Sequence, residues 1–195
     1  MTKFFGNLNA VVTAGVLATL AVLFWSLSNQ LPGNALPVAA WMTFLHVISG
    51  VMWIGLLYYF NFVQIPTMPA IPAELKPAVS KYIAPKALFW FRYAALATVV
   101  TGLIVAYLNG YLHQAFTFQA GNRLIGLGMW LALIMAFNVW FVIWPNQKKA
   151  LGIVDAAPEV KAKAAVTAMI FSRTNTLLSV PMLFAMVAHR LGAAF

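Results

Sequence analysis

Five long apolar segments follow one another along the chain, separated by short polar stretches. They cover residues 9–27, 38–63, 87–108, 124–144 and 164–192. Each is close to or above the roughly 20 residues that an α-helix needs to cross the hydrocarbon core of a bilayer. The pattern predicts an all-α integral membrane protein: a five-helix transmembrane bundle that forms a single domain over residues 1–195.

The last apolar segment carries a polar stripe. Its polar and sulfur-containing side chains recur at steps of three and four residues: Ser172, Asn175, Ser179, Met182, Met186 and His189. Such spacing puts all of them on one face of a helix. Because polar groups inside a membrane need partners, we expect this stripe to face the inside of the bundle. Segment 38–63 has a matching stripe of His46, Gly50, Trp53 and Leu57.

Two regions between the ends allow different interpretations. Lys3 precedes segment 9–27, so a signal peptide is an alternative. The apolar run is longer than that of a typical signal, and no small-x-small cleavage site follows, so we interpret it as a retained helix. Residues 29–37 hold two prolines and a glycine and predict a turn. Within the proline-rich loop 64–86 we expect a short surface helix near residues 73–82.

Composition and charge support the membrane interpretation. The chain is 63% hydrophobic and 8% charged, against about 25% charged residues in a soluble domain. Its net charge of +9 could indicate a nucleic-acid partner. The lysines instead cluster in the loops of one side, with Arg123 and Arg190 on the other. This asymmetry predicts a cytoplasmic N-terminus, an external C-terminus and no nucleic-acid partner.

The histidines are the candidate cofactor ligands. The chain has no cysteine, which excludes disulfides, thiolate metal sites and covalent c-type heme. His46 lies about 12 Å and His189 about 5 Å from the outer ends of their segments, by helical rise. Facing imidazoles are a common way for a helical bundle to hold heme b, and Gly50 would leave room for the macrocycle. Met186 is the alternative to His189 as second axial ligand.

Other roles remain open for these residues. His46 could be a buried histidine bonded to a neighbouring hydroxyl, and His189 an interfacial residue. His113 lies in a loop, and we expect it to be solvated. Two thioethers and an imidazole suit Cu(I), so Met182, Met186 and His189 are an alternative copper site. Methionines at helical spacing also commonly fill cores.

Two arginines lie inside apolar segments that contain no acid. A charge in such a position is costly and is commonly functional. Arg92 is only about 7 Å inside its segment by helical rise, so its side chain could reach the interface. Arg173 is deeper, and we expect it to contact an anion, such as a heme propionate, or backbone carbonyls within the bundle. Both arginines are candidate cofactor-binding residues.

Several motifs together resemble a known family. They are His46-Val-Ile-Ser-Gly-Val-Met-Trp-Ile-Gly55, Tyr58-Tyr-Phe60, Trp90-Phe-Arg92, Asn138-Val-Trp140, Trp144-Pro-Asn-Gln-Lys148, Ser172-Arg-Thr-Asn175 and Leu178-Ser-Val-Pro-Met182. In this order they resemble the membrane domain of the bacterial cytochrome-linked urate oxidases of the PuuD type. The broader resemblance is to small helical membrane proteins of the HemJ and CopD kind, which are associated with heme or copper.

The resemblance implies a bacterial inner-membrane protein with a heme-binding histidine at His46. Members that oxidise urate carry further membrane segments and a cytochrome c domain, so urate oxidation is not expected of this chain alone. The family also has a lysine where Arg92 stands. No nucleophile–base pair or paired carboxylates indicate an enzyme of another class.

Three functional hypotheses follow. The first is electron transfer through heme b, with a separate cytochrome or a larger membrane complex as partner. The second is a non-catalytic accessory subunit of a respiratory or oxidase complex. The third is copper handling.

Overall fold

The structure, a computed structural model, describes residues 2–28 and 38–192. The chain divides into two compact units, residues 1–41 and 42–195. The first unit holds α1 (Thr2–Phe5) and α2 (Leu8–Ser28). Helix α2 coincides with the first predicted segment. The predicted turn at 29–37 lies outside the described residues, and the single-domain organisation stays a prediction.

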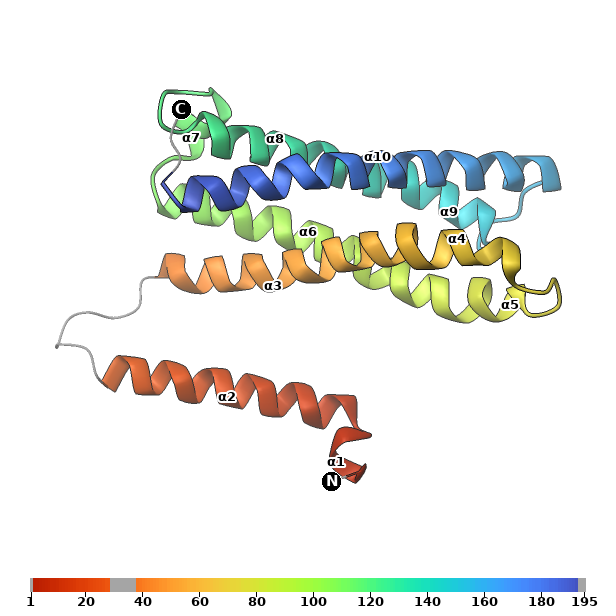
Figure 1. Ribbon diagram of the computed structural model, residues 1–195, viewed down its shortest axis with the longest axis horizontal. Helices are drawn as coiled ribbons and strands as arrows, with labels where there is room; N and C mark the ends of the chain where they lie inside the picture. Colours follow the sequence, from red (N-terminus) through yellow and green to blue (C-terminus); the bar gives the residue numbers. More distant parts are fainter. Residues whose placement is uncertain (1, 29–37, 193–195) are drawn as a thin grey trace. The chain divides into compact units, whose positions relative to one another are not determined.

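The rest of the described chain is also helical, without strands in the described ranges (Figure 1). In order it contains α3 (Val38–Tyr58), η1 (Tyr59–Gln64), α4 (Ile65–Thr67), η2 (Met68–Ala70), α5 (Lys76–Ala78), η3 (Val79–Ile83), α6 (Ala84–Leu108), α7 (Leu112–Phe116), α8 (Arg123–Phe137), η4 (Asn138–Ile143), α9 (Trp144–Ala150) and α10 (Pro158–Arg190). The segments η1, η3 and η4 are π-helical, and η2 is a 3₁₀ turn.

These elements join into four long helices. They run over Val38–Ala70, Lys76–Leu108, Arg123–Ala150 and Pro158–Arg190, and each is long and apolar enough to cross a membrane. Helix α2 is not among these four, so the fifth span stays a prediction. The expected separate surface helix near 73–82 is wrong, because residues from Lys76 onward continue without interruption into α6.

Local sequence explains where the helices begin and end. Helix α10 begins with Pro158, whose missing N–H costs nothing in the first turn, and Glu159 follows beside the positive end of the helix dipole. Helix α6 ends at Leu108, and Gly110 follows its C-cap residue with a φ of +75°, which favours glycine. There the Tyr111 N–H donates to the Ala106 carbonyl at 3.1 Å, as in a Schellman motif.

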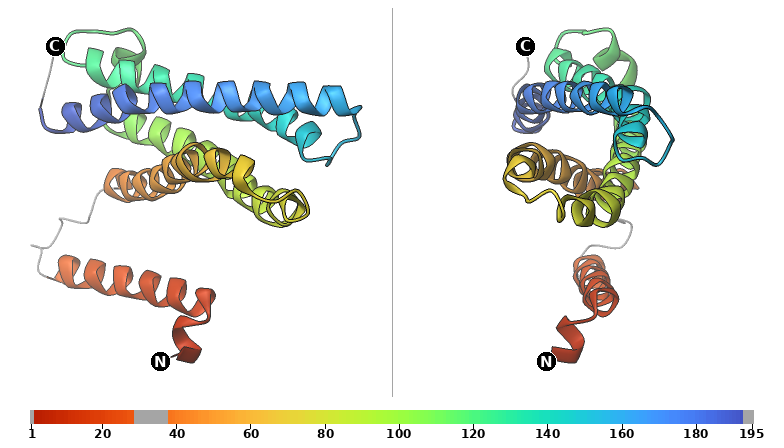
Figure 2. Two further views of the ribbon diagram at one scale, coloured as in Figure 1. Left: turned by 45° about the vertical axis from the view of Figure 1, so that its right-hand side comes forward. Right: turned by 90° about the vertical axis from the view of Figure 1, so that its right-hand side faces the viewer.

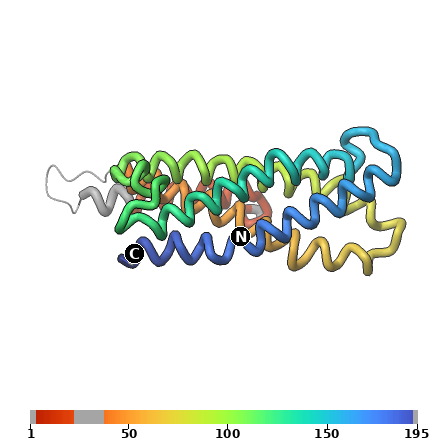
Figure 3. The backbone as a smooth tube through the Cα atoms, turned by 90° about the horizontal axis from the view of Figure 1, so that it is seen from above, coloured from red at the N-terminus to blue at the C-terminus, as the bar shows by residue number. Residues whose placement is uncertain are grey.

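In the second unit the four long helices lie side by side and alternate in direction (Figures 1 and 2). The loops 71–75 and 151–157 lie at one end, and α7 and the end of α10 lie at the other; Figure 3 shows the same grouping from above. The sequence pattern placed these two loops on one side, and their positions agree with it.

The core of this unit is built from all four long helices. Its largest fully buried side chains are Trp53, Phe91, Leu57, Met135, Val139, Asn175 and Ser179. A smaller cluster of Ala106, Ala115, Ile125 and Met129 lies near α7, and Met186 packs against both clusters. Two fully buried polar residues within an apolar core are unusual, and they direct attention to α10.

Candidate functional site

The polar stripe of α10 faces the core, as its spacing predicts. Asn175 and Ser179 are fully buried, and Ser172 and Met182 are each 5% exposed. Met186 and His189, toward the end of the helix, are half-buried. The stripe therefore penetrates the bundle most deeply around Asn175.

Each buried polar group of the stripe bonds to another helix. The Asn138 amide donates to Asn175 Oδ1 at 2.9 Å, and the Asn175 amide donates to the Met135 carbonyl at 2.9 Å. Asn61 Nδ2 donates to Ser172 Oγ at 2.8 Å. These bonds join α10 to η1, α8 and η4 in a polar layer across the core.

Two residues of this layer lie in π-helical segments. Asn61 belongs to η1 and Asn138 to η4. A π-helical turn widens the helix, and such turns are frequently found at functional sites. A further hydrogen bond joins α10 to α3, where the Tyr58 hydroxyl lies 3.0 Å from Ser179 Oγ.

Arg92 is buried among aromatic side chains of the bundle. Its side chain is only 8% exposed, and its guanidinium carbon lies 3.3 Å from the centroid of the Trp144 ring. The rings of Tyr93 and Trp140 lie 6.0 Å away. Arg92 Nε and Nη1 have no hydrogen-bond partner in the described part of the chain. Arg92 is therefore covered by neighbouring side chains, and its position relative to the membrane interface stays a prediction.

Arg173, in contrast to Arg92, is exposed. It was expected to make contacts within the bundle, but its side chain is exposed. Consecutive residues of a helix are about 100° apart. Because Ser172 faces the core, Arg173 is turned away from it. The expectation of a contact inside the bundle is wrong for this arginine.

His46 packs on the neighbouring helix α6. Its Nδ1 lies 2.8 Å from the Thr98 carbonyl, which can only accept, so Nδ1 carries the proton and Nε2 keeps its lone pair. The imidazole is half-buried. A Cβ added at Gly102 would lie 2.8 Å from His46 Cε1, so only glycine leaves room for this ring. The packing gives His46 one fixed tautomer.

The other proposed ligands lie elsewhere. A Cβ added at Gly50 would lie 3.8 Å from Thr98, an ordinary contact. The His189 ring lies 5.6 Å from that of Tyr111. No hydrogen bond or ring contact in the described ranges joins His189 to His46. The neighbouring Tyr111 hydroxyl has its pKa raised by burial, and the positive charge of Arg190 opposes that shift. Axial ligation by His189 or Met186 stays a prediction.

The two methionines of the stripe contact different parts of the bundle. Met182 is buried in the main core, and Met186 Sδ lies against Gly128 of α8. The copper site they would form with His189 also stays a prediction. His113 is exposed, as expected, although it lies in the short helix α7 rather than in a loop. The described residues contain no cluster of three or more His, Asp or Glu side chains.

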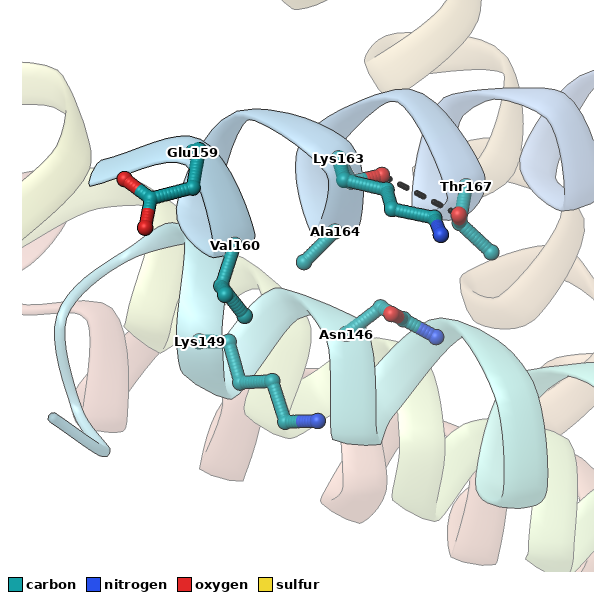
Figure 4. Close-up of a pocket in the computed structure, with 7 residues that line it drawn as sticks. All are labelled: Asn146, Lys149, Glu159, Val160, Lys163, Ala164 and Thr167. Carbon is teal, nitrogen blue, oxygen red and sulfur yellow. Dashed lines mark hydrogen bonds between the residues drawn. The ribbon is translucent and has the colours of Figure 1, made fainter. Parts of the chain in front are cut away.

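The sequence motifs contain Trp140, Trp144 and Lys148, but they did not indicate that these residues surround Arg92. The three recur at steps of four, and this stripe could have placed them on one face. Gly102 gave no signal, because its role depends on the ring that packs against it. A separate pocket of about 470 Å³ lies between α9 and α10 (Figure 4); its lining residues are Asn146, Lys149, Glu159, Val160, Lys163, Ala164 and Thr167.

A comparison with known families gives a match for the second half of the chain. The family model described as urate oxidase N-terminal matches residues 95–195, which contain the stripe of α10 and the residues of η4 and α9. His46 and Arg92 precede the matched region. No curated protein and no solved structure matches the chain. Because the match covers more than half of the chain, this protein belongs to the urate oxidase N-terminal family.

Proposed function

We propose that this protein is a multi-pass protein of the bacterial inner membrane that binds heme b through His46 and transfers electrons to a partner. Its exposed surface supports a membrane location. Large apolar side chains such as Phe141, Leu177 and Phe184 are each about two-thirds exposed or more. Such surfaces are unfavourable in water but match the acyl chains of lipid.

The observation that carries the heme proposal is the hydrogen bond from His46 Nδ1 to the Thr98 carbonyl. Histidines that bind a metal commonly donate their second ring nitrogen to a carbonyl, which fixes the tautomer and orients the ring. The donor chemistry of His46 thus fits a heme iron at Nε2. A heme b held there would supply a one-electron carrier.

The surroundings of His46 support the same role. Gly102 lets the ring lie close to α6, and Thr101 Oγ1 approaches Nδ1 at 3.5 Å. The Thr101 contact is made to Nδ1, and the closest approaches of Gly102 are to Cε1 and Nδ1, with Nε2 farther away. The residues of α6 therefore orient the imidazole while leaving the coordinating nitrogen uncommitted among the contacts described.

An absorption spectrum of the detergent-purified protein tests this proposal. We expect a Soret band and sharp α and β bands after reduction. The His46→Ala variant should lose the reduced α band while still inserting into the membrane. His113→Ala is the matched control, because His113 is exposed, and it should keep the band.

A colourless protein would contradict the heme proposal. The second candidate, a non-catalytic accessory subunit of a respiratory or oxidase complex, would then be the better explanation. Copurification of the tagged chain with larger membrane subunits from its native membrane would test that candidate directly.

A further inference from the structure

Arg92 is a buried cation without an anion. The chain contains only three acids, Glu74, Asp155 and Glu159, and none forms an ion pair with Arg92. An uncompensated charge inside a low-dielectric core is costly, so a retained buried charge normally has a partner. No acid in the described part of the chain supplies that partner.

The aromatic residues around Arg92 leave the edge of its guanidinium free. The group lies over the Trp144 ring at 3.3 Å, a contact that stabilises the cation through its flat face. A guanidinium in this position keeps its N–H groups directed sideways, in the plane of the group. Two of its nitrogens, Nε and Nη1, are buried and lack acceptors, and each lies beside Nη2 on its own edge of the group.

A second cation lies at the same indole. Lys148 Nζ is 5.7 Å from the centroid of the Trp144 ring, and this lysine is half-buried. Trp140 adds a buried donor, Nε1, that also lacks an acceptor. Two acceptors, Asn61 Oδ1 and Gln64 Oε1, are unpaired in η1, but both are neutral amide oxygens. The groups around the Trp144 ring therefore carry a net positive charge.

We propose that Arg92, with Lys148 and Trp140, forms a binding site for a carboxylate. The adjacent N–H groups of a guanidinium match the two oxygens of a carboxylate in a bidentate pair. The low exposure of Arg92 favours a compact group over a bulky one. Two sources have this chemistry: a free small organic acid and a propionate of bound heme. The site stands on the contacts of Arg92 and does not require the proposed role of His46.

Thermal unfolding of the purified full-length protein in detergent tests the site. Sodium acetate is the probe, titrated against sodium chloride at constant ionic strength. We expect a saturable rise in Tm for the native sequence. In Arg92→Gln the apparent affinity should fall at least about tenfold, the loss of a charge-assisted pair. Arg173→Gln is the matched control, because that arginine is exposed, and it should retain the full rise.

Further variants separate binding from folding. If Arg92→Gln does not fold, Trp140→Phe and Lys148→Gln should each weaken acetate binding, since each removes one neighbouring donor. A heme propionate as the source gives a different result: acetate has no effect, and the heme content of the purified protein falls in Arg92→Gln but not in Arg173→Gln. Two results would overturn the proposal. In both, acetate has no effect on Tm; in the first the heme content is the same in Arg92→Gln and the native sequence, and in the second the purified protein holds no heme.

Discussion

At the scale of single residues, Asn175 connects three parts of the bundle. It is fully buried on α10 and bonds to Asn138 of η4 and to the Met135 carbonyl of α8. Both amide groups of the pair are committed, so removing one leaves the other without its partner. The cost of such a loss comes mainly from the group left unpaired.

Asn175→Ala should therefore lower the free energy of unfolding by about 1–2 kcal/mol. Thr174→Ala is the control, because the Thr174 hydroxyl bonds only to the Ile170 carbonyl of its own helix. The two variants can be compared by thermal unfolding in detergent. Equal stability of both would show that the amide pair contributes nothing to the core.

Gly102 supports a second prediction at this scale. In Gly102→Ala the new Cβ would meet His46 Cε1 at 2.8 Å and Nδ1 at 3.0 Å, so the imidazole must move and lose its bond to Thr98. We expect destabilisation of about 1–3 kcal/mol, typical of overpacking. Modification of His46 by diethyl pyrocarbonate, followed by mass spectrometry, should become faster.

The control for this change is Gly55→Ala. Nothing lies within 4 Å of a Cβ at Gly55. Alanine there should leave the reactivity of His46 unchanged, and its better helix propensity should keep stability equal or slightly higher. Unchanged His46 reactivity in Gly102→Ala would contradict the close packing of the ring.

At the scale of elements, each π-helical segment is followed by a proline. In each case the proline stands two residues after the last residue of the segment: Pro66 after η1, Pro85 after η3 and Pro145 after η4. A proline inside a helix lacks an N–H and its ring crowds the carbonyl four residues earlier. In all three cases that carbonyl lies within the π-helical segment. The wider turn gives the ring room, so the helix continues through the proline.

Pro145→Ala should consequently disturb the site around Arg92. Alanine restores the N–H that can bond to the Phe141 carbonyl and so favours a regular α-turn over 138–143. Removing the extra residue of the π turn rotates the two sides of the helix by about 100° relative to each other. Trp144 would then move away from Arg92, and the tryptophan signal in near-ultraviolet circular dichroism should fall.

Pro181→Ala is the control for this prediction. Helix α10 continues as an ordinary α-helix through Pro181. Its replacement should leave the tryptophan signal in place. A similar spectrum for Pro145→Ala and the native sequence would mean that the π turn does not depend on the proline.

At the scale of the whole molecule, the lysines mark one end of the second unit. The loops 71–75 and 151–157 lie at this end (Figure 1), and seven lysines lie in the helical segments that flank these loops: Lys76, Lys81, Lys86, Lys148, Lys149, Lys161 and Lys163. Arg190 lies in the last turn of α10, at the other end. Because lysine-rich loops are retained in the cytoplasm, this end should be cytoplasmic.

A reporter fused at the C-terminus tests the orientation. An external C-terminus predicts activity of a periplasmic reporter such as alkaline phosphatase and inactivity of a cytoplasmic one. A reporter within loop 151–157 should give the reverse result. If α2 is a fifth span, a reporter at the N-terminus should also be cytoplasmic, and external labelling there would contradict five crossings.

The sequence by itself determined which segments are apolar helices and which faces turn inward on two of them. The stripe from Ser172 to Met182 and the pair Trp53 and Leu57 are buried as their spacing predicts. Both results depend on local periodicity, since side chains three and four residues apart share one face of a helix. The position of His46 in an apolar segment also made it the candidate heme ligand, and that role stays a prediction.

Only the tertiary structure decided how the two arginines are used. Depth along a helix suggested that Arg92 would reach the interface and that Arg173 would turn inward, but Arg92 is buried by protein and Arg173 is exposed. The contact of Arg92 with Trp144 and that of Gly102 with the His46 ring both join residues that are distant in sequence. Periodicity defines a face, but packing between helices decides what that face meets, because the partner residues come from other segments.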